Sequence, residues 1–246
     1  MFMKNLRDLI FLGVSMLISM SLNAQEVISI DAESAGLSPK QIKLLDLIQG
    51  REYSDAKELL RNYKVNERTK RGITLLWWTA NLGDYENFIF LLENGASPLN
   101  QTLDTYNIME LCAAQEDSRF LNAALEKGGS ANLISYHRRA TPIFTAVKYH
   151  NVENVETLLD AGAATNIADN IGRTPALWAA EFNAFEILVL LLKAGADPAI
   201  KDIWGLNVFE SLKEKELESA NPQLSYLKEA INLIEEKKKG TGEGGQ

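Results

Sequence analysis

The chain has 246 residues, of which 46% are hydrophobic and 24% are charged, and its formal net charge is −8. This composition provides enough apolar side chains for a buried core and excludes a chain that is disordered throughout. The negative charge, with no extended run of lysine and arginine, excludes a nucleic-acid binder that works through a basic face.

The first residues have the features of a secretory signal peptide. Lys4 and Arg7 precede an apolar run over residues 9–20, and small and polar residues follow up to Ala24. A basic start, an apolar run of about 7–15 residues and a small residue at the end are typical of an export signal. The run is short for a membrane-spanning helix, which needs about 20 apolar residues. We predict a signal peptide over residues 1–24, with an uncleaved membrane anchor as the alternative.

The middle of the chain repeats itself at a nearly constant spacing. Four similar segments each end in glycine, at Gly95, Gly128, Gly162 and Gly195, which are separated by 33, 34 and 33 residues. Each glycine follows an apolar pattern with helical spacing, where a left-handed residue is needed to end a helix. A regular series of helix ends indicates a repeated helical unit.

A residue that can cap a helix lies 21 positions before each of these glycines. The four residues are Thr74, Asn107, Thr141 and Thr174. Their short side-chain oxygens can accept a hydrogen bond from an unpaired backbone N–H of the first turn. Each unit is therefore predicted to contain a capped helix, a tight turn, a second helix and a glycine stop.

The sequence after the capping residue resembles the ankyrin repeat, whose signature is Thr-Pro-Leu-His-x-Ala. Residues 141–146 and 174–179 match it best, and residues 74–80 and 107–113 are looser copies. No copy keeps the histidine of the family. The residues at its position in three units are Trp77, Phe144 and Leu177. We expect apolar packing between units to replace the hydrogen bond that threonine and histidine form in the family.

The resemblance covers residues 41–238 and implies an all-α ankyrin-repeat solenoid of about six helix-turn-helix units with short β-hairpin fingers. A linker is predicted over residues 25–40, before an N-terminal capping repeat over residues 41–73. The internal repeats are predicted over residues 74–106, 107–140, 141–173 and 174–206. A C-terminal capping repeat over 207–238 and a disordered tail over 239–246 complete the chain.

Three pairs of residues have the spacing of a reciprocal helix cap. Ser38 with Gln41, Asn107 with Glu110, and Asn207 with Glu210 each place an acceptor three positions after a capping residue. In such a box each side chain binds a backbone N–H near the other residue. We therefore interpret Glu110 and Glu210 as structural caps.

The resemblance also implies where a partner would bind. In the family, recognition involves the hairpin tips, called fingers, and the exposed ends of the first helices, called the palm. The candidate partner-binding residues in these columns are Leu82, Tyr106, Arg138, Tyr149, Arg173, Phe182 and Trp204. Aromatic residues and arginine are the types enriched at interface hot spots.

Tyr149 and Phe182 occupy the same palm column in consecutive repeats, and we expect them to form a docking strip. The alternative is that they pack against the finger of the next repeat. Trp78 and Trp178 belong to a different column and are expected in the core between repeats. The palm and fingers also carry several cations, which predict a locally basic surface suited to an acidic patch on a partner. These cations are Lys70, Arg71, Arg138, Lys148 and Arg173.

The sequence contains no recognisable catalytic, cofactor or metal site. His137 and His150 lie at no metal-ligand spacing with each other or with Cys112, and the glycines follow the repeat rather than a phosphate-binding loop. Cys112 falls in a column of small residues, where a buried thiol is expected. We predict that the protein is not an enzyme and uses no cofactor or metal.

These observations predict a non-catalytic protein–protein interaction module exported to the bacterial cell envelope, periplasmic or secreted. It would bind another protein as a monomer, without nucleic acid and without a membrane span after signal cleavage. One version is an immunity or inhibitor protein for a toxic enzyme, and the alternative is a periplasmic scaffold or chaperone-like support for an envelope enzyme. An enzyme built on helical repeats is disfavoured because no nucleophile, base or metal site is present.

Overall fold

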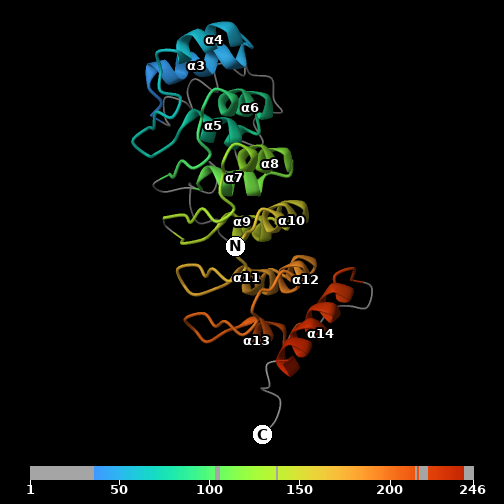
Figure 1. Ribbon diagram of the computed structural model, residues 1–246. Coiled ribbons are helices and arrows are strands. Elements are labelled where there is room, and N and C mark those ends of the chain that lie inside the picture. The colour runs from blue at the N-terminus through green and yellow to red at the C-terminus, as the bar shows by residue number, and fades with distance from the viewer. Residues whose placement is uncertain (1–35, 103–105, 137, 214, 216–220, 241–246) are drawn as a thin grey trace, which may run out of the picture. The chain divides into compact units, whose positions relative to one another are not determined.

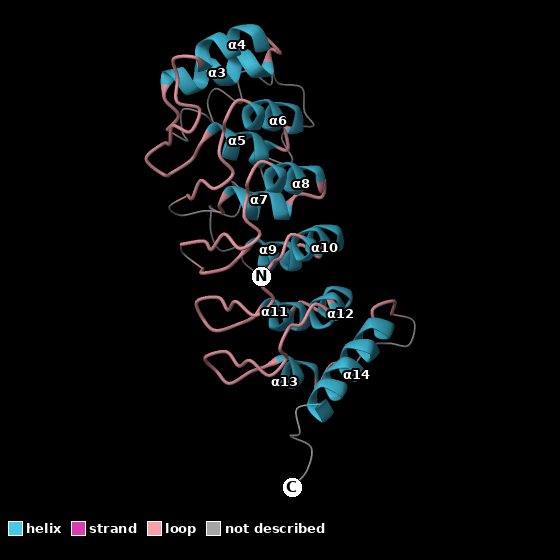
Figure 2. Ribbon diagram, in the orientation of Figure 1, coloured by secondary structure: helices cyan, strands magenta, loops and turns pink. Residues whose placement is uncertain are grey.

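The computed structural model describes residues 36–102, 106–136, 138–213, 215 and 221–240. Within these residues the chain forms twelve helices and no strand (Figures 1 and 2). The described residues belong to two compact units, the first over 36–63 and 68–71 and the second over 64–67 and from 72 onward. The predicted signal peptide lies outside the described residues.

The first unit contains α3 (Pro39–Gln49) and α4 (Tyr53–Leu60). α3 begins at the predicted capping box. The Gln41 N–H donates to Ser38 Oγ, and the Ser38 N–H donates to Gln41 Oε1 at 2.8 Å. Proline at the first helical position costs no hydrogen bond, because that N–H has no partner within a helix. The capping box predicted for Ser38 and Gln41 is confirmed, and the helix that it begins starts two residues inside the predicted linker.

The second unit is a stack of helix pairs. The pairs are α5 (Leu75–Leu82) with α6 (Tyr85–Glu93), α7 (Ile108–Ala114) with α8 (Arg119–Glu126), α9 (Pro142–Lys148) with α10 (Val152–Asp160), α11 (Pro175–Glu181) with α12 (Phe185–Lys193), and α13 (Val208–Leu212) with α14 (Leu224–Gly240). Each first helix packs on the next first helix, and each second helix on the next second helix (Figure 1). α14 includes residues 239 and 240 of the predicted tail, and residues 241–246 lie outside the described part.

The predicted capping residues begin the first helices of this stack. Thr74, Asn107, Thr174 and Asn207 each accept a hydrogen bond from the N–H three positions later. Thr141 begins α9 without such a bond, and its buried hydroxyl has no partner. The second helices of the internal pairs end before the predicted glycines, which have positive φ angles between 78° and 97°.

The two expected acidic caps behave differently. Glu110 and Asn107 form the reciprocal box, with both hydrogen bonds at 2.9 Å, so this prediction is confirmed. The Glu210 N–H donates to Asn207, but the Glu210 carboxylate binds Lys213 Nζ at 2.6 Å. The reciprocal cap predicted at Glu210 is wrong because this side chain is exposed and a lysine lies one turn further along.

Apolar side chains fill the position of the family's histidine, as predicted. Trp77, Phe144 and Leu177 are 6%, 1% and 0% exposed. Trp78 and Trp178 are also buried, and the Trp178 ring lies edge-on to Phe144 with their centroids 5.3 Å apart. The units are therefore joined by apolar contacts, as expected for a stack in which each repeat is stabilised by its neighbours.

The fingers are hairpin-shaped turns, and the predicted β-hairpins are wrong for the described residues. Each of three fingers is closed by a backbone bond of 2.9 Å, in which Ser135, Asp169 or Asp202 donates to Ala140, Arg173 or Leu206. A second bond of 3.0 or 3.1 Å returns to the carbonyl of the same residue, from Arg139 to Ser135, from Gly172 to Asp169 and from Gly205 to Asp202. A strand ladder needs bonds repeated along two strands, and bonds that meet at one residue of each finger form a turn. Neighbouring fingers are also joined, because Asn170 N–H donates to Arg138 O and Ile203 N–H donates to Ile171 O.

Candidate partner-binding face

Three of the candidate binding residues are exposed. Tyr149 is 51% exposed, Phe182 40% and Trp204 71%. Tyr149 and Phe182 are the residues that end α9 and α11, and each precedes a residue with a left-handed backbone, His150 or Asn183. The same helix ending in consecutive units therefore presents one aromatic ring per unit.

One cluster forms around Tyr106, which is half-buried at the base of a finger. The Trp77 indole N–H donates to the Tyr106 carbonyl at 2.7 Å and fixes its backbone. The Arg138 guanidinium lies 4.1 Å from the centre of the Tyr106 ring, and Lys148 Nζ lies 3.1 Å from its hydroxyl. Lys148 Nζ is also 5.4 Å from the centre of the Tyr149 ring. We call Tyr106, Arg138, Lys148 and Tyr149 the Tyr106 cluster.

A buried carboxylate neutralises one cation of this cluster. Arg138 Nη2 lies 2.8 Å from Glu110 Oε1, and the Glu110 side chain is fully buried. Burial raises the pKa of Glu110, although the charge of Arg138 opposes the rise. Burial would also raise the pKa of the Tyr106 hydroxyl, but Arg138 and Lys148 outweigh it and lower that pKa. The Arg138 guanidinium thus contacts both the Glu110 carboxylate and the Tyr106 ring.

A second cluster forms one repeat later around Trp178. The Phe182 ring lies edge-on to the Trp178 ring at 5.3 Å, and the Arg173 guanidinium lies 4.7 Å from the Trp178 ring centre. Asp169 Oδ2 accepts hydrogen bonds from Arg173 Nε and Trp178 Nε1, both at 3.0 Å. Arg173 Nη1 also reaches Glu181 Oε2 at 3.3 Å. We call Asp169, Arg173, Trp178, Glu181 and Phe182 the Trp178 cluster.

The prediction of a basic surface is wrong for Arg138 and Arg173. Arg138 is paired with Glu110, and Arg173 is paired with Asp169 and Glu181. Lys148 has no carboxylate partner among the residues described. Lys70 and Arg71 belong to the first unit. The arginines therefore hold the clusters in shape, and Lys148 supplies the uncompensated positive charge.

Leu82 and Trp204 belong to neither cluster. Leu82 is half-buried at the end of α5, and Trp204 lies with the exposed Ile203 in the finger before α13. From the sequence, Glu110 is predicted only as a cap, and its pairing with Arg138 is missed. The signal that could have linked them is an acid three residues after a cap, followed by an arginine in the finger at the end of the same repeat.

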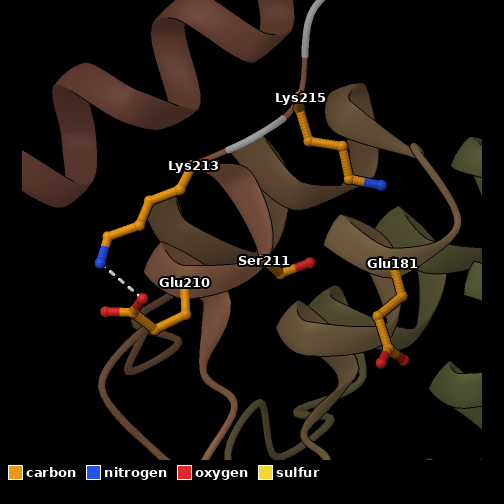
Figure 3. Close-up of a pocket in the computed structure, with 5 residues that line it drawn as sticks. All are labelled: Glu181, Glu210, Ser211, Lys213 and Lys215. Carbon is orange, nitrogen blue, oxygen red and sulfur yellow. Dashed lines mark hydrogen bonds and ion pairs between the residues drawn. The ribbon is translucent and has the colours of Figure 1, made fainter.

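A wide, polar cavity of about 520 Å³ opens at the C-terminal end of the stack. The residues that line it are Glu181, Glu210, Ser211, Lys213 and Lys215 (Figure 3). Lys213 binds Glu210, and Lys215 Nζ binds Asn183 Oδ1 at 2.7 Å. These lysines are therefore already engaged within the chain.

The described residues hold no group of histidine, cysteine, aspartate and glutamate side chains that could bind a metal ion. Cys112 is fully buried, and burial raises the pKa of its thiol. His150 is exposed, and His137 lies outside the described residues. The face thus offers aromatic rings and charges for binding.

Every helix in the described part of the chain is too short or too polar to cross a bilayer.

Comparison with known proteins gives matches to ankyrin repeats. A family model described as "Ankyrin repeats (3 copies)" matches residues 108–202, which include both clusters except Tyr106. "Protein PhlB" of Serratia liquefaciens is 31% identical over 120 residues, which cover 49% of this chain and 53% of that protein. The chain therefore spans about half the length of this relative.

Two further relatives match over shorter shares of their own lengths. "Putative E3 ubiquitin-protein ligase XBAT31" of Arabidopsis thaliana is 24% identical over 139 residues, 55% of this chain and 30% of that protein. "Putative ankyrin repeat protein L92" of Acanthamoeba polyphaga mimivirus is 40% identical over 60 residues, 24% of this chain and 14% of that protein.

Proposed function

This chain contains ankyrin repeats over residues 108–202, a protein–protein interaction module, and we propose that it binds its partner through Tyr149, Phe182 and the cations beside them. The exposure of Tyr149 and Phe182 carries this proposal. Rings that packed under the next finger would be covered, whereas these are 51% and 40% exposed at the same position of consecutive units. Exposed aromatic rings in a row are typical of a docking surface.

The rings are also held in place before a partner arrives. Phe182 rests on Trp178, and Tyr149 lies beside Lys148, which is in turn bound to Tyr106. A preorganised side chain loses less conformational entropy on binding than a free one. Lys148 adds a charge that pairs with no carboxylate in the described part of the chain, which favours an acidic group on the partner at this point.

We further propose that the protein is exported to the cell envelope and acts there as the inhibitor of a toxic enzyme. The basic start, apolar run and small residue of residues 1–24 support export. The rigid face supports one tight partner, as an inhibitor requires. A scaffold or chaperone-like support for an envelope enzyme is the alternative, and it would show several weaker partners.

The test compares capture of partners from envelope extract by the wild-type protein and by the Tyr149→Ala/Phe182→Ala double variant. We expect the wild type to retain one stoichiometric enzyme and to inhibit it. The double variant should bind it at least about tenfold more weakly, since hot-spot truncations cost about 2 kcal/mol or more. Leu99→Ala is the matched control, because Leu99 is 46% exposed and lies outside both clusters.

The proposal fails if the double variant keeps the wild-type circular dichroism spectrum and captures the same enzyme with unchanged affinity. Several partners that bind without inhibition would favour the scaffold instead.

Export has its own test, which is the N-terminal sequence of the protein recovered from the envelope fraction. A mature chain beginning at Gln25 is expected, and recovery of the protein with Met1 intact would contradict cleavage.

A further inference from the structure

Two consecutive fingers have the same turn. We call residues 169–173 the preceding finger and residues 202–206 the terminal finger, which lies at the end of the row of fingers, beside α13 (Figures 1 and 2). In each, the first residue is an aspartate whose Oδ1 accepts two backbone N–H groups of its own turn, at 2.9 or 3.0 Å. The glycines at the fourth position, Gly172 and Gly205, have φ angles of +85° and +80°. Since the turns match, their surfaces can be compared position by position.

The backbone of the terminal finger lies directly on the preceding finger. A Cβ added to Gly172 would lie 3.1 Å from Asp202 Cα and 3.4 Å from the Ile203 nitrogen. Glycine permits this close approach, because a side chain would occupy the space. The Ile203 N–H also donates to Ile171 O at 3.0 Å. The preceding finger therefore receives a backbone segment through one glycine and one carbonyl.

The terminal finger has the same glycine and the same carbonyl, and both are open. A Cβ added to Gly205 would meet no atom of the described residues within 4 Å. The Trp204 carbonyl corresponds to that of Ile171, and in the described part of the chain it accepts no backbone hydrogen bond. The terminal finger thus offers a place for one more backbone segment, of the kind that it supplies to its neighbour.

Two large apolar side chains are exposed on the terminal finger. Ile203 is 66% exposed and Trp204 is 71% exposed. The preceding finger has Asn170 and the half-buried Ile171 in their places. Terminal repeats of a solenoid normally have a polar outer face, which keeps the stack soluble. The terminal finger departs from this rule, and exposed apolar side chains next to one another are typical of a binding surface.

The hydrogen bonds of the terminal finger limit what can bind there. All five backbone N–H groups of residues 202–206 already donate, to oxygens of this finger or of Ile171. Two copies of the finger therefore have no N–H to offer each other's open carbonyl. A lipid tail has no donor either. A polypeptide segment of another protein supplies backbone N–H groups and apolar side chains together.

The terminal finger is also continuous with the proposed binding face. The Ile203 N–H joins it to the preceding finger, which carries Arg173. The Arg173 guanidinium lies 4.7 Å from the centre of the Trp178 ring, and the Phe182 ring lies edge-on to that ring at 5.3 Å. One partner can therefore contact Phe182 on the palm and the end of the finger row at the same time.

We propose that the terminal finger binds an extended segment of the partner protein, an inference that rests on the proposed function. A backbone N–H of this segment donates to the Trp204 carbonyl, as the Ile203 N–H donates to Ile171. The segment passes close to Gly205, and one of its apolar side chains packs against Ile203 and Trp204. The backbone bond then contributes affinity, and the apolar contact contributes selectivity.

The test uses short peptide probes and the isotope-labelled full chain, observed by two-dimensional amide NMR. The main probe is acetyl-Lys-Ile-Ile-Lys-amide, which has backbone N–H groups and apolar side chains. One control probe has both isoleucines N-methylated, and the other has serine in place of both isoleucines. The Gly205 amide reports on the site because its nitrogen is bonded to the Trp204 carbonyl. We expect saturable shifts with the main probe and at least about fivefold weaker binding of each control, since each lacks one of the two contacts.

Two variants test the position of the site. Trp204→Ser removes the ring and keeps the carbonyl, and Gly205→Ala adds a Cβ where the segment passes. We expect each to weaken binding of the main probe at least about fivefold while circular dichroism confirms the fold. Gly162→Ala is the matched control, because Gly162 has a φ of +78° and open space around it but lies outside the fingers. This control should bind the probe as the wild type does.

Four outcomes would each overturn the inference. The first two are equal binding of the N-methylated probe and unchanged binding by a folded Trp204→Ser variant. The third is a shift of the Gly205 amide that depends on protein concentration without any probe, which would assign the surface to a second copy. The fourth is binding to phosphatidylcholine vesicles without a response to the peptides, which would assign it to lipid.

The peptide titration needs no partner protein, so it is independent of the test of the proposed function. The Tyr149→Ala/Phe182→Ala variant leaves the terminal finger intact and should still bind the main probe. Partner capture that depends on Tyr149 and Phe182, without peptide binding at the terminal finger, would overturn this inference alone. Peptide binding with partner capture that ignores the two rings would overturn the proposed face.

Discussion

Removal of the Arg138 charge should expose the cost of burying Glu110. Arg138→Met keeps the apolar stem but leaves a fully buried carboxylate without its counter-ion at 2.8 Å. Breaking a buried ion pair from one side costs about 3–5 kcal/mol. Arg138 is partly exposed, and Glu110 keeps its bond to the Asn107 N–H at 2.9 Å, so we expect a loss of about 2–3 kcal/mol in the free energy of unfolding. Urea unfolding followed by circular dichroism measures this loss.

The loss should depend on pH in a defined direction. Burial raises the pKa of Glu110 in the folded state, and removal of Arg138 removes a charge that opposes the rise. The folded state then holds a proton that the unfolded state has lost. Stability therefore falls as the pH increases from the ordinary glutamate pKa through the raised one, and it is level above that. We expect the Arg138→Met variant to lose less stability at about pH 4 than at about pH 8.

The double variant Glu110→Gln/Arg138→Met separates the contribution of the Glu110–Arg138 pair to stability from that of the other carboxylates. Glutamine still accepts the Asn107 N–H and carries no charge, so the double variant should regain most of the loss and lie within about 1 kcal/mol of the wild type. Its stability should lack the extra pH dependence of Arg138→Met. A loss below about 0.5 kcal/mol, or an equal loss at both pH values, would refute the role of Arg138 as the counter-ion of a buried acid.

Two further predictions concern the fingers and the palm. In Gly172→Ala the new Cβ would lie 3.1 Å from Asp202 Cα at a φ of +85°, so we expect a larger loss in thermal stability than in Gly162→Ala, where φ is +78° and the space is open. Gly162→Ala, the control, should lose about 1–2 kcal/mol of stability from backbone strain alone. Equal losses in the two variants would contradict the close approach of the two fingers. Trp178→Phe removes a donor from Asp169 and trims the ring between Phe144 and Phe182, so it should cost about 2–3 kcal/mol in urea unfolding. A loss below about 0.5 kcal/mol would show that the indole N–H and ring edge contribute little.

The features of the fold that depend on local sequence could be predicted. Thr74, Thr174 and Asn107 cap their helices because a side-chain oxygen three residues from an N–H needs no distant partner. The glycine after the second helix of each internal pair has the positive φ that ends a helix. The prediction of β-hairpin fingers is wrong because strand pairing depends on bonds repeated along the hairpin, and the backbone bonds that close each of these three fingers meet at one residue.

The repeat in the sequence predicts where the candidate face lies, but not how much of its charge is neutralised within the chain. The repeat places Tyr149 and Phe182 in one column, and their exposure follows from the end of the helix that carries them. The partner of Arg138 depends on a contact between residues far apart in the chain, because Glu110 lies 28 residues before it. A list of cations along the sequence does not contain this information, so the surface was expected to be more basic than it is.

The structure gives the arginines and the aromatic rings of this face different roles. Arg138 joins a finger to Glu110 in the preceding helix pair, and Arg173 joins its finger to the end of α11 through Asp169 and Glu181. Their replacement should change the stability of the stack, in which neighbouring units support one another. Tyr149 and Trp204 project into solvent and could change with less effect on stability. The choice of partner is therefore expected to depend on the exposed rings and on Lys148, with the paired arginines as their fixed support.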